Sequence, residues 1–217
     1  MSGADALRGV ELSIVVPCYN EAAGIEAFWR RLTAAGAPLG LAWEAVFVND
    51  GRSDATLEAI SRLTVETGAV QVIDFSRNFG KEAAITAGLD HARGAAVVII
   101  DADLQHPPEI IPEMVRLWRQ GTEVVLCRRE SRDSDSPLRA LLSGLFYKLS
   151  SRLFEVKIPR DVGDFRLVGR KALETFKQMP ERDRFVRGMF GWMGFKQTAV
   201  SFERPERAAG ETKYPFW

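Results

Sequence analysis

Short apolar runs alternate with segments of helical spacing along the first 129 residues of the chain. The runs have the length of strands and are almost continuously apolar, which is typical of strands buried on both faces of a sheet. The segments between them repeat apolar residues every three or four positions, which predicts helices. The predicted strands cover residues 12–20, 43–50, 70–76, 95–101 and 123–129, and the predicted helices cover residues 21–35, 54–66, 81–92 and 108–120. This alternation predicts an α/β fold with a mainly parallel sheet and helices on both of its faces.

The pattern changes after Arg128. Residues 128–137 are polar and charged and predict a mobile loop, and residues 138–154 predict a long amphipathic helix. The remaining segments are a strand with glycine turns at 161–170, a stretch rich in aromatics and glycine at 184–195, and a strand followed by a basic tail at 197–217. No internal repeat or interdomain linker separates these segments, so we expect one domain over residues 1–217.

Composition narrows the class of protein. Lys+Arg and Asp+Glu both number 29, so the net charge is zero and nothing in the overall charge favours a nucleic-acid partner. Cys18 and Cys127 are far apart in sequence, and the N-terminus has no signal-peptide pattern, so both are expected to be reduced core residues in the cytoplasm. No apolar run approaches the roughly 18 residues of a membrane-spanning helix.

Two carboxylates follow the fourth predicted strand, in the sequence VIIDADLQH. Asp101 and Asp103 are two residues apart, so at a strand end both can point to one place. Like charges repel unless a cation or a shared proton lies between them, and Mg²⁺ or Mn²⁺ is held by one or two carboxylates plus substrate phosphates. These residues therefore predict a metal–diphosphate site. The same sequence is also compatible with a solvated turn in which Asp103 caps the next helix. His106 follows the pair and lies either near the metal or packed within the loop.

Other polar residues fall at the ends of the predicted strands, where open α/β sheets bind ligands. Asp50 could accept hydrogen bonds from a ribose or base, or form an Asp-Gly turn. Glu21 could accept a ribose hydroxyl, or be a favourable charge at a helix N-terminus. Arg77 and Lys81 could lie near a diphosphate or be surface cations. Asp164 is flanked by apolar strand residues, which indicates a specific role for its carboxylate.

A second anion site is suggested by cations in the C-terminal half of the chain. Arg128, Arg139 and Lys213 are its candidate residues, and Ser143 lies one helical turn from Arg139. For any one of these cations taken alone, a solvated surface position is the more usual interpretation.

Taken in order, seven stretches of the chain resemble family 2 glycosyltransferases with the GT-A fold, a Rossmann-like three-layer sandwich. They are SIVVPCYNEAAGI, VFVNDGRSDAT, SRNFGKEAAITAGLDHARG, VIIDADLQHPPEIIPEM, GDFRLVGR, RFVRGMFGWMGF and GETKYP. More narrowly, the chain is similar to the polyprenyl-phosphate branch, which includes bactoprenol glucosyltransferases and dolichol-phosphate sugar synthases. The resemblance covers residues 12–215.

The resemblance implies a role for each matching residue. Asp101 and Asp103 match the family's Asp-x-Asp, with Asp103 the direct ligand of Mg²⁺ or Mn²⁺ and Gln105 nearby. Asp164 would face the sugar and the acceptor as the candidate base. On the donor side, the nucleoside pocket would be lined by Pro17, Tyr19, Glu21 and Asp50, with Lys81 near the diphosphate. Arg187 and Trp192 fall in the motif that closes over the donor. On the acceptor side, the phosphate would be held by Arg128, Arg139 and Ser143, and Lys213 would lie beside the membrane.

The function implied is inverting transfer of a hexose from a nucleotide-diphosphate sugar, UDP-glucose by resemblance, to a polyprenyl phosphate at the cytoplasmic face of the membrane. Because the acceptor is already anionic, the arginines have to bring it to the anomeric carbon and a strong base is less necessary. The helix at 138–154 either lies on the bilayer or packs in the core. A nucleic-acid partner is not expected, and self-association into a homo-oligomer is left open.

The chain departs from the family pattern in two places. Arg52 stands where Ser usually follows Asp-Gly, and the chain stops at Trp217, where the membrane-anchored branch continues into two transmembrane helices. We therefore expect either a fragment or a peripheral protein. Transfer to a saccharide acceptor, with Asp164 as a true base, and a non-catalytic nucleotide-sugar-binding module are the alternatives. A nucleotidyltransferase would need a glycine-rich phosphate loop, which PCYNEAAG is not.

Overall fold

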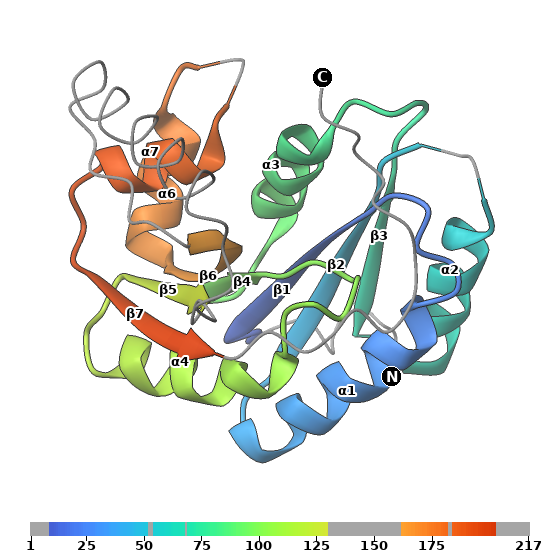
Figure 1. Ribbon diagram of the computed structural model, residues 1–217, viewed down its shortest axis with the longest axis horizontal. Helices are drawn as coiled ribbons and strands as arrows, with labels where there is room; N and C mark the ends of the chain where they lie inside the picture. Colours follow the sequence, from blue (N-terminus) through green and yellow to red (C-terminus); the bar gives the residue numbers. More distant parts are fainter. Residues whose placement is uncertain (1–8, 52–53, 68, 130–161, 182–183, 203–217) are drawn as a thin grey trace, which may run out of the picture.

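A seven-stranded sheet forms the centre of the computed structural model, which describes residues 9–51, 54–67, 69–129, 162–181 and 184–202 (Figure 1). The strand order is β3-β2-β1-β4-β6-β5-β7. The strands are β1 (Leu12–Cys18), β2 (Trp43–Asn49), β3 (Val70–Asp74), β4 (Ala96–Ile99), β5 (Val124–Arg129), β6 (Val162–Gly169) and β7 (Gln197–Phe202). The helices are α1 (Ile25–Gly36), α2 (Thr56–Thr67), α3 (Lys81–His91), α4 (Ile111–Arg119), α6 (Arg170–Gln178) and α7 (Val186–Trp192), with short 3-10 turns at Ala37–Leu39 and Pro108–Ile110.

The mainly parallel sheet predicted from the sequence is confirmed, with one reversed strand. Strands β1 to β4 pair in parallel, and β5 pairs in parallel with β7. Strand β6 is inserted antiparallel between β4 and β5. The first residues of β6 therefore lie at the same edge of the sheet as the last residues of its neighbours.

Helices cover both faces of the sheet, as the alternating pattern predicts. Apolar residues of α1, α2 and α4 pack with one set of strand side chains, and those of α3, α6 and α7 pack with the alternate set. Along β1, for example, Ile14 and Val16 belong to the first cluster and Val15 to the second, because successive strand residues face opposite sides. Most strand residues are buried, which explains their continuously apolar sequence.

Helix α3 lies unusually close to β1. A Cβ atom at Gly88 would come within 2.3 Å of the Val15 Cγ1 atom. Because real Cβ atoms do not approach that closely, glycine at this position lets the helix rest on the strand. The start of α3 is thereby fixed beside the edge of the sheet where β1 ends.

Several sequence expectations differ in detail or fall outside the described residues. Helix α1 begins at Ile25, four residues later than predicted, and the helices α6 and α7 were not predicted. The amphipathic helix expected at 138–154 lies outside the described residues, as do most of the loop expected at 128–137 and the basic tail. In the ranges that the structure describes, none of the helices combines the length and apolarity needed to cross a membrane.

Candidate active site

One edge of the sheet gathers the acidic residues that the sequence analysis singled out. Ile99 of β4 pairs with Arg166 of β6. Because the two strands are antiparallel, each step forward along β4 corresponds to one step back along β6. Two residues beyond Ile99, Asp101 therefore comes opposite Asp164. The reversal of β6 is what brings a carboxylate from a distant part of the sequence to the end of β4.

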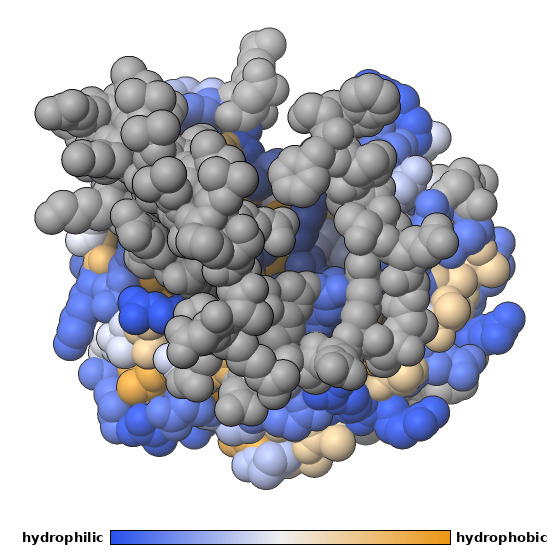
Figure 2. Space-filling view, in the orientation of Figure 1, coloured by the Kyte–Doolittle hydropathy of each residue, from blue (hydrophilic) through white to orange (hydrophobic). Residues whose placement is uncertain are grey.

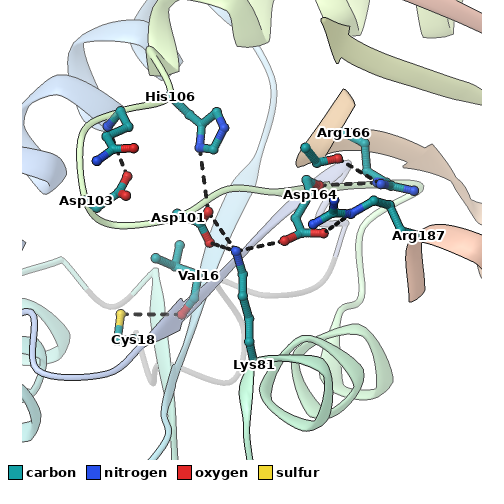
Figure 3. A network of polar contacts seen from close by, with 11 residues as sticks. Val16, Cys18, Lys81, Asp101, Asp103, His106, Asp164, Arg166 and Arg187 are labelled. Atoms are coloured by element: carbon teal, nitrogen blue, oxygen red, sulfur yellow. Dashed lines mark hydrogen bonds and ion pairs between the residues drawn. The ribbon is translucent and has the colours of Figure 1, made fainter. Parts of the chain in front are cut away.

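Lys81 joins these two carboxylates. As the first residue of α3, it places its Nζ atom 2.8 Å from Asp101 Oδ2 and 2.8 Å from Asp164 Oδ2. Arg187, on α7, places its Nε atom 2.9 Å from Asp164 Oδ1. Both oxygens of Asp164 are thus held by cations from two different helices (Figure 3).

The charges of this cluster stabilise one another. Burial by itself raises the pKa of Asp164, whose side chain is only 9% exposed, but the Lys81 ammonium and the hydrogen bonds from Arg187 and Lys81 outweigh it and hold the pKa well below its usual range. Burial likewise lowers the pKa of Lys81, but Asp101 and Asp164 outweigh it and raise that pKa above its usual range. Both groups are therefore ionised at neutral pH.

The second carboxylate of the Asp-x-Asp pair lies apart from this ion-pair network (Figure 3). Asp103 accepts a hydrogen bond from the backbone N–H of Gln105 on Oδ1, at 3.0 Å. Between them, Leu104 has a positive φ of 60°, which turns the chain sharply after Asp103. Gln105 itself is buried.

Asp101 and Asp103 are chemically suited to a hard divalent cation, because carboxylate oxygens are its preferred ligands. No group of three or more His, Cys, Asp or Glu residues within metal-binding reach occurs among the described residues. The pair therefore fits a cation such as Mg²⁺ that takes one or two carboxylates and completes its shell with substrate oxygens and water. This donor set fits the metal that the sequence analysis predicts.

His106 lies beside Asp101 and packs against aromatic side chains of β6 and β7. Its Nδ1 atom is 3.6 Å from Asp101 Oδ2, and its ring lies 5.4 Å from the Phe165 ring and 5.8 Å from the Phe202 ring. The ring thus packs against two strands, and a metal beside His106 stays a prediction.

Asp50 holds the loop that leads into α3. Its side chain is almost fully buried, and its oxygens accept hydrogen bonds from the backbone N–H groups of Phe79, at 2.7 Å, and Gly80, at 3.0 Å. The next residue, Gly51, has a φ of 98°, and a Cβ atom there would lie 2.6 Å from the Asn78 backbone nitrogen. Asp50 and Gly51 together fix the loop before Lys81, and the contact of Asp50 with a ribose or base stays a prediction.

The residues expected at the nucleoside pocket lie at and beyond the end of β1. Pro17 lies within β1, opposite Val48, and Tyr19 follows the strand half-buried. The backbone N–H of Glu21 donates to Thr56 Oγ1 at 2.9 Å, so the start of α2 fixes this segment.

The second anion site is only partly visible. Arg128 is exposed on β5, whereas Arg139, Ser143 and Lys213 lie outside the described residues.

Trp192, the last residue of α7, has 63% of its surface exposed. In the middle of the face seen in Figure 2, the described atoms that are visible are mostly hydrophilic.

The sequence analysis missed two residues that adjoin Asp164. Arg166 is 2% exposed, and its guanidinium donates to the carbonyl oxygens of Gly163, at 2.9 Å, and Asp164, at 3.3 Å. An arginine inside the apolar run of a strand was the signal for it. Glu82, in the first turn of α3, accepts the backbone N–H of Val186 at 3.0 Å. No pattern in the local sequence pointed to that contact, which spans 104 residues.

An α/β sheet with one reversed strand and carboxylates gathered at its ligand-binding edge matches the transferase class that the sequence motifs resemble. The chain belongs to glycosyl transferase family 2, whose sequence profile matches residues 13–176. It is 44% identical over 208 residues to an uncharacterized glycosyltransferase of Synechocystis sp., covering 96% of this chain and 65% of the relative. It is 42% identical over 208 residues to the prophage bactoprenol glucosyl transferase homolog of Escherichia coli K12, covering 96% of this chain and 68% of that relative.

The fold has counterparts among solved structures. A mannosyltransferase from Pyrobaculum calidifontis, solved in complex with GDP-Man and Mn²⁺, superposes with a TM-score of 0.66 at 22% identity, over 94% of this chain and 59% of that one. This similarity confirms the GT-A fold. The chain spans about two thirds of the length of the curated relatives that it matches.

Proposed function

We propose that this chain carries the catalytic site of an inverting glycosyltransferase that moves glucose from UDP-glucose to a polyprenyl phosphate at the cytoplasmic face of the membrane. Membership of family 2 supports the reaction class. Relatives named as bactoprenol glucosyl transferases, at 42% and 41% identity over 96% of this chain, support the sugar and the lipid acceptor.

The geometry of Asp164 is the observation that most supports a phosphate acceptor. Lys81 and Arg187 engage its two carboxylate oxygens, and its pKa is held well below its usual range. A carboxylate with a low pKa is a weak general base, because the best base titrates near the working pH. A saccharide hydroxyl would need a base here, whereas a phosphate acceptor is already an anion. The arrangement therefore favours the lipid phosphate over a sugar hydroxyl.

Asp101 and Asp103 would hold Mg²⁺ or Mn²⁺. When bound, the divalent ion supplies positive charge that stabilises the leaving nucleoside diphosphate. The Mn²⁺ in the Pyrobaculum calidifontis mannosyltransferase, which has the same fold, supports this assignment.

The chain's own residues bind and orient the two substrates. Lys81 and Arg187 hold Asp164 ionised and fixed, so that its charge can stabilise an electron-poor anomeric carbon or orient the acceptor. Pro17, Tyr19 and Glu21 would line the nucleoside pocket. The acceptor phosphate would be held by Arg128, Arg139 and Ser143, with Lys213 beside the membrane.

A transfer assay with competing acceptors tests this function. The chain is incubated with labelled UDP-glucose, Mn²⁺ and polyprenyl phosphate in detergent, and in parallel with soluble oligosaccharides. We expect label in the organic phase and none in the oligosaccharide, with the lipid product having the anomeric configuration opposite to that of the donor. Transfer to the oligosaccharide alone, or a product that retains the donor configuration, would contradict the proposal.

Arg128 provides a matched test of the acceptor side. The variant Arg128→Gln should raise the KM for polyprenyl phosphate roughly tenfold, because a charge-assisted hydrogen bond contributes about 1.5–3 kcal/mol. The KM for UDP-glucose should stay unchanged. Arg119→Gln, on the exposed end of α4, is the control and should alter neither constant.

A further inference from the structure

Helix α7 has no capping side chain of its own. Its N-cap residue, Phe185, makes no side-chain hydrogen bond to the helix. The first helical N–H group, that of Val186, instead donates to Glu82 Oε2 at 3.0 Å. A carboxylate from α3 thus caps α7 from 104 residues away in the sequence.

This contact closes a ring around Asp164. Lys81 and Glu82 are the first two residues of α3, and Val186 and Arg187 are the first two residues of α7. Within each pair, one residue binds Asp164 and the other joins the two helices: Lys81 and Arg187 hold the two oxygens of Asp164, while Glu82 binds Val186. Glu82 thus joins the starts of the two helices that supply Lys81 and Arg187.

The environment of Glu82 supports a dedicated role. The side chain is half-buried, and burial raises its pKa above the usual range although the Val186 hydrogen bond opposes this effect. Among the described residues, the Glu82 carboxylate accepts its hydrogen bond from the Val186 N–H group. Partial burial removes water from the Glu82 carboxylate, which costs free energy because no cation in the described part of the chain is bonded to it. The same carboxylate on the surface would not have this cost.

We infer that Glu82 is a positioning residue that fixes the start of α7 and thereby aligns Arg187 with Asp164. Its importance for transfer rests on the proposed function, whereas its contact with Val186 can be tested without it. The first experiment compares exchange of the Val186 amide proton in the wild type, Glu82→Ala and Glu82→Gln. Glu58→Ala is the control, because Glu58 is also an acidic residue in the first turn of a helix but is exposed.

Glu82→Ala should speed exchange of the Val186 amide roughly 2- to 10-fold, since it removes one buried hydrogen bond. Glu82→Gln should restore most of the protection, because its amide oxygen can accept the same N–H. Glu58→Ala should leave Val186 unchanged. Wild-type protection of Val186 in Glu82→Ala would overturn the inference.

A double-mutant cycle separates positioning from a general loss of stability. If Glu82 acts through Arg187, Glu82→Ala should lower kcat several-fold in the wild type, with KM for UDP-glucose within twofold, but have no further effect in an Arg187→Ala background. Equal effects of Glu82→Ala on kcat in both backgrounds would overturn the positioning role. If the wild type transfers no sugar at all, the proposed function fails, and the same cycle is then measured on the free energy of unfolding.

Discussion

Lys81 explains how two carboxylates, Asp101 and Asp164, can lie close together at one edge of the sheet. Its ammonium lies 2.8 Å from both Asp101 and Asp164, which come from strands that run in opposite directions. Without a cation between them, the two carboxylates would repel and one would take up a proton. The Lys81 ammonium therefore compensates both carboxylates and helps to hold the pKa of Asp164 below its usual range.

Replacing Lys81 by methionine tests this role on stability. We expect Lys81→Met to lower the free energy of unfolding by about 1–3 kcal/mol at pH 7, because it leaves two carboxylates without their shared partner. Urea denaturation measures the change. Lys171→Met, at an exposed position of α6, is the control and should change stability by less than about 0.5 kcal/mol. Equal effects of the two substitutions would show that the Lys81 ion pairs contribute nothing specific.

The pH dependence of stability tests the charge on Asp164. Because its folded pKa is below its unfolded value of about 3.9, its ion pairs stabilise the fold above that pH and lose their effect as the pH falls toward the folded pKa. The variant Asp164→Asn should cost about 3 kcal/mol at pH 7, and this difference from wild type should shrink below about pH 4. Urea denaturation at pH 7 and at pH 3 compares the two. A difference that stays constant over this range would mean that Asp164 is not ionised in the fold.

At the scale of elements, helix α3 organises the site. Its first turn supplies Lys81 and Glu82, its preceding loop is held by Asp50, and its middle rests on β1 at Gly88. Each of these contacts joins α3 to a different part of the chain. The position of Lys81 therefore depends both on the loop that Asp50 holds and on the packing of the helix against β1.

Substitutions at Asp50 separate its contact with the α3 loop from a contact with the nucleotide. Asp50→Ala removes the acceptor of two backbone N–H groups, so it should lower the unfolding free energy by about 1–3 kcal/mol and speed amide exchange at Phe79 and Gly80. Asp50→Asn keeps one acceptor oxygen and should lose less. If Asp50→Ala weakens nucleotide binding while both amides keep their wild-type protection, the carboxylate serves the ligand and not the loop.

The elements that the sequence predicted well are those whose pattern is local. Strands β1, β2 and β4 are mostly apolar because both of their faces are buried, and the structure places a strand in each of the five predicted segments. The reversed placement of β6 is a pairing between segments distant in the chain, so no local pattern could reveal it. Helix α7 contains Gly188 and Gly191, which are typical of loops, and α6 has apolar spacing over nine residues only.

The candidate site was predicted in parts but not as a cluster. Asp101, Asp103, Asp164 and Lys81 were each identified from their neighbours in the sequence. That Lys81 bridges two carboxylates could not be foreseen, because the contact follows from the reversal of β6. Glu82 was missed because its partner, Val186, is distant in the chain.

At the scale of the whole molecule, one edge of the sheet brings together the residues proposed for the nucleoside, the diphosphate and the sugar. Tyr19 and Glu21 follow β1, the Asp101–Asp103 pair follows β4, and Asp164 begins β6. Their order across the sheet, β1-β4-β6, gives a direction in which an extended nucleotide-sugar could lie. The acceptor would then approach from beyond Asp164, on the side where Arg128 lies near the end of β5.

The central claim is that this edge of the sheet holds a metal-dependent nucleotide-sugar site. Nucleotide binding measured with and without Mn²⁺ is its most direct test. Isothermal titration calorimetry with UDP, GDP, UDP-glucose and GDP-mannose would be run on the wild type and on Asp103→Ala. We predict that UDP and UDP-glucose bind only with Mn²⁺, and that Asp103→Ala weakens this binding at least tenfold, in line with the roughly 1.4 kcal/mol or more expected for a lost metal ligand. Nucleotide binding that is equally tight without the metal, or unchanged in Asp103→Ala, would contradict the site assigned to this edge of the sheet.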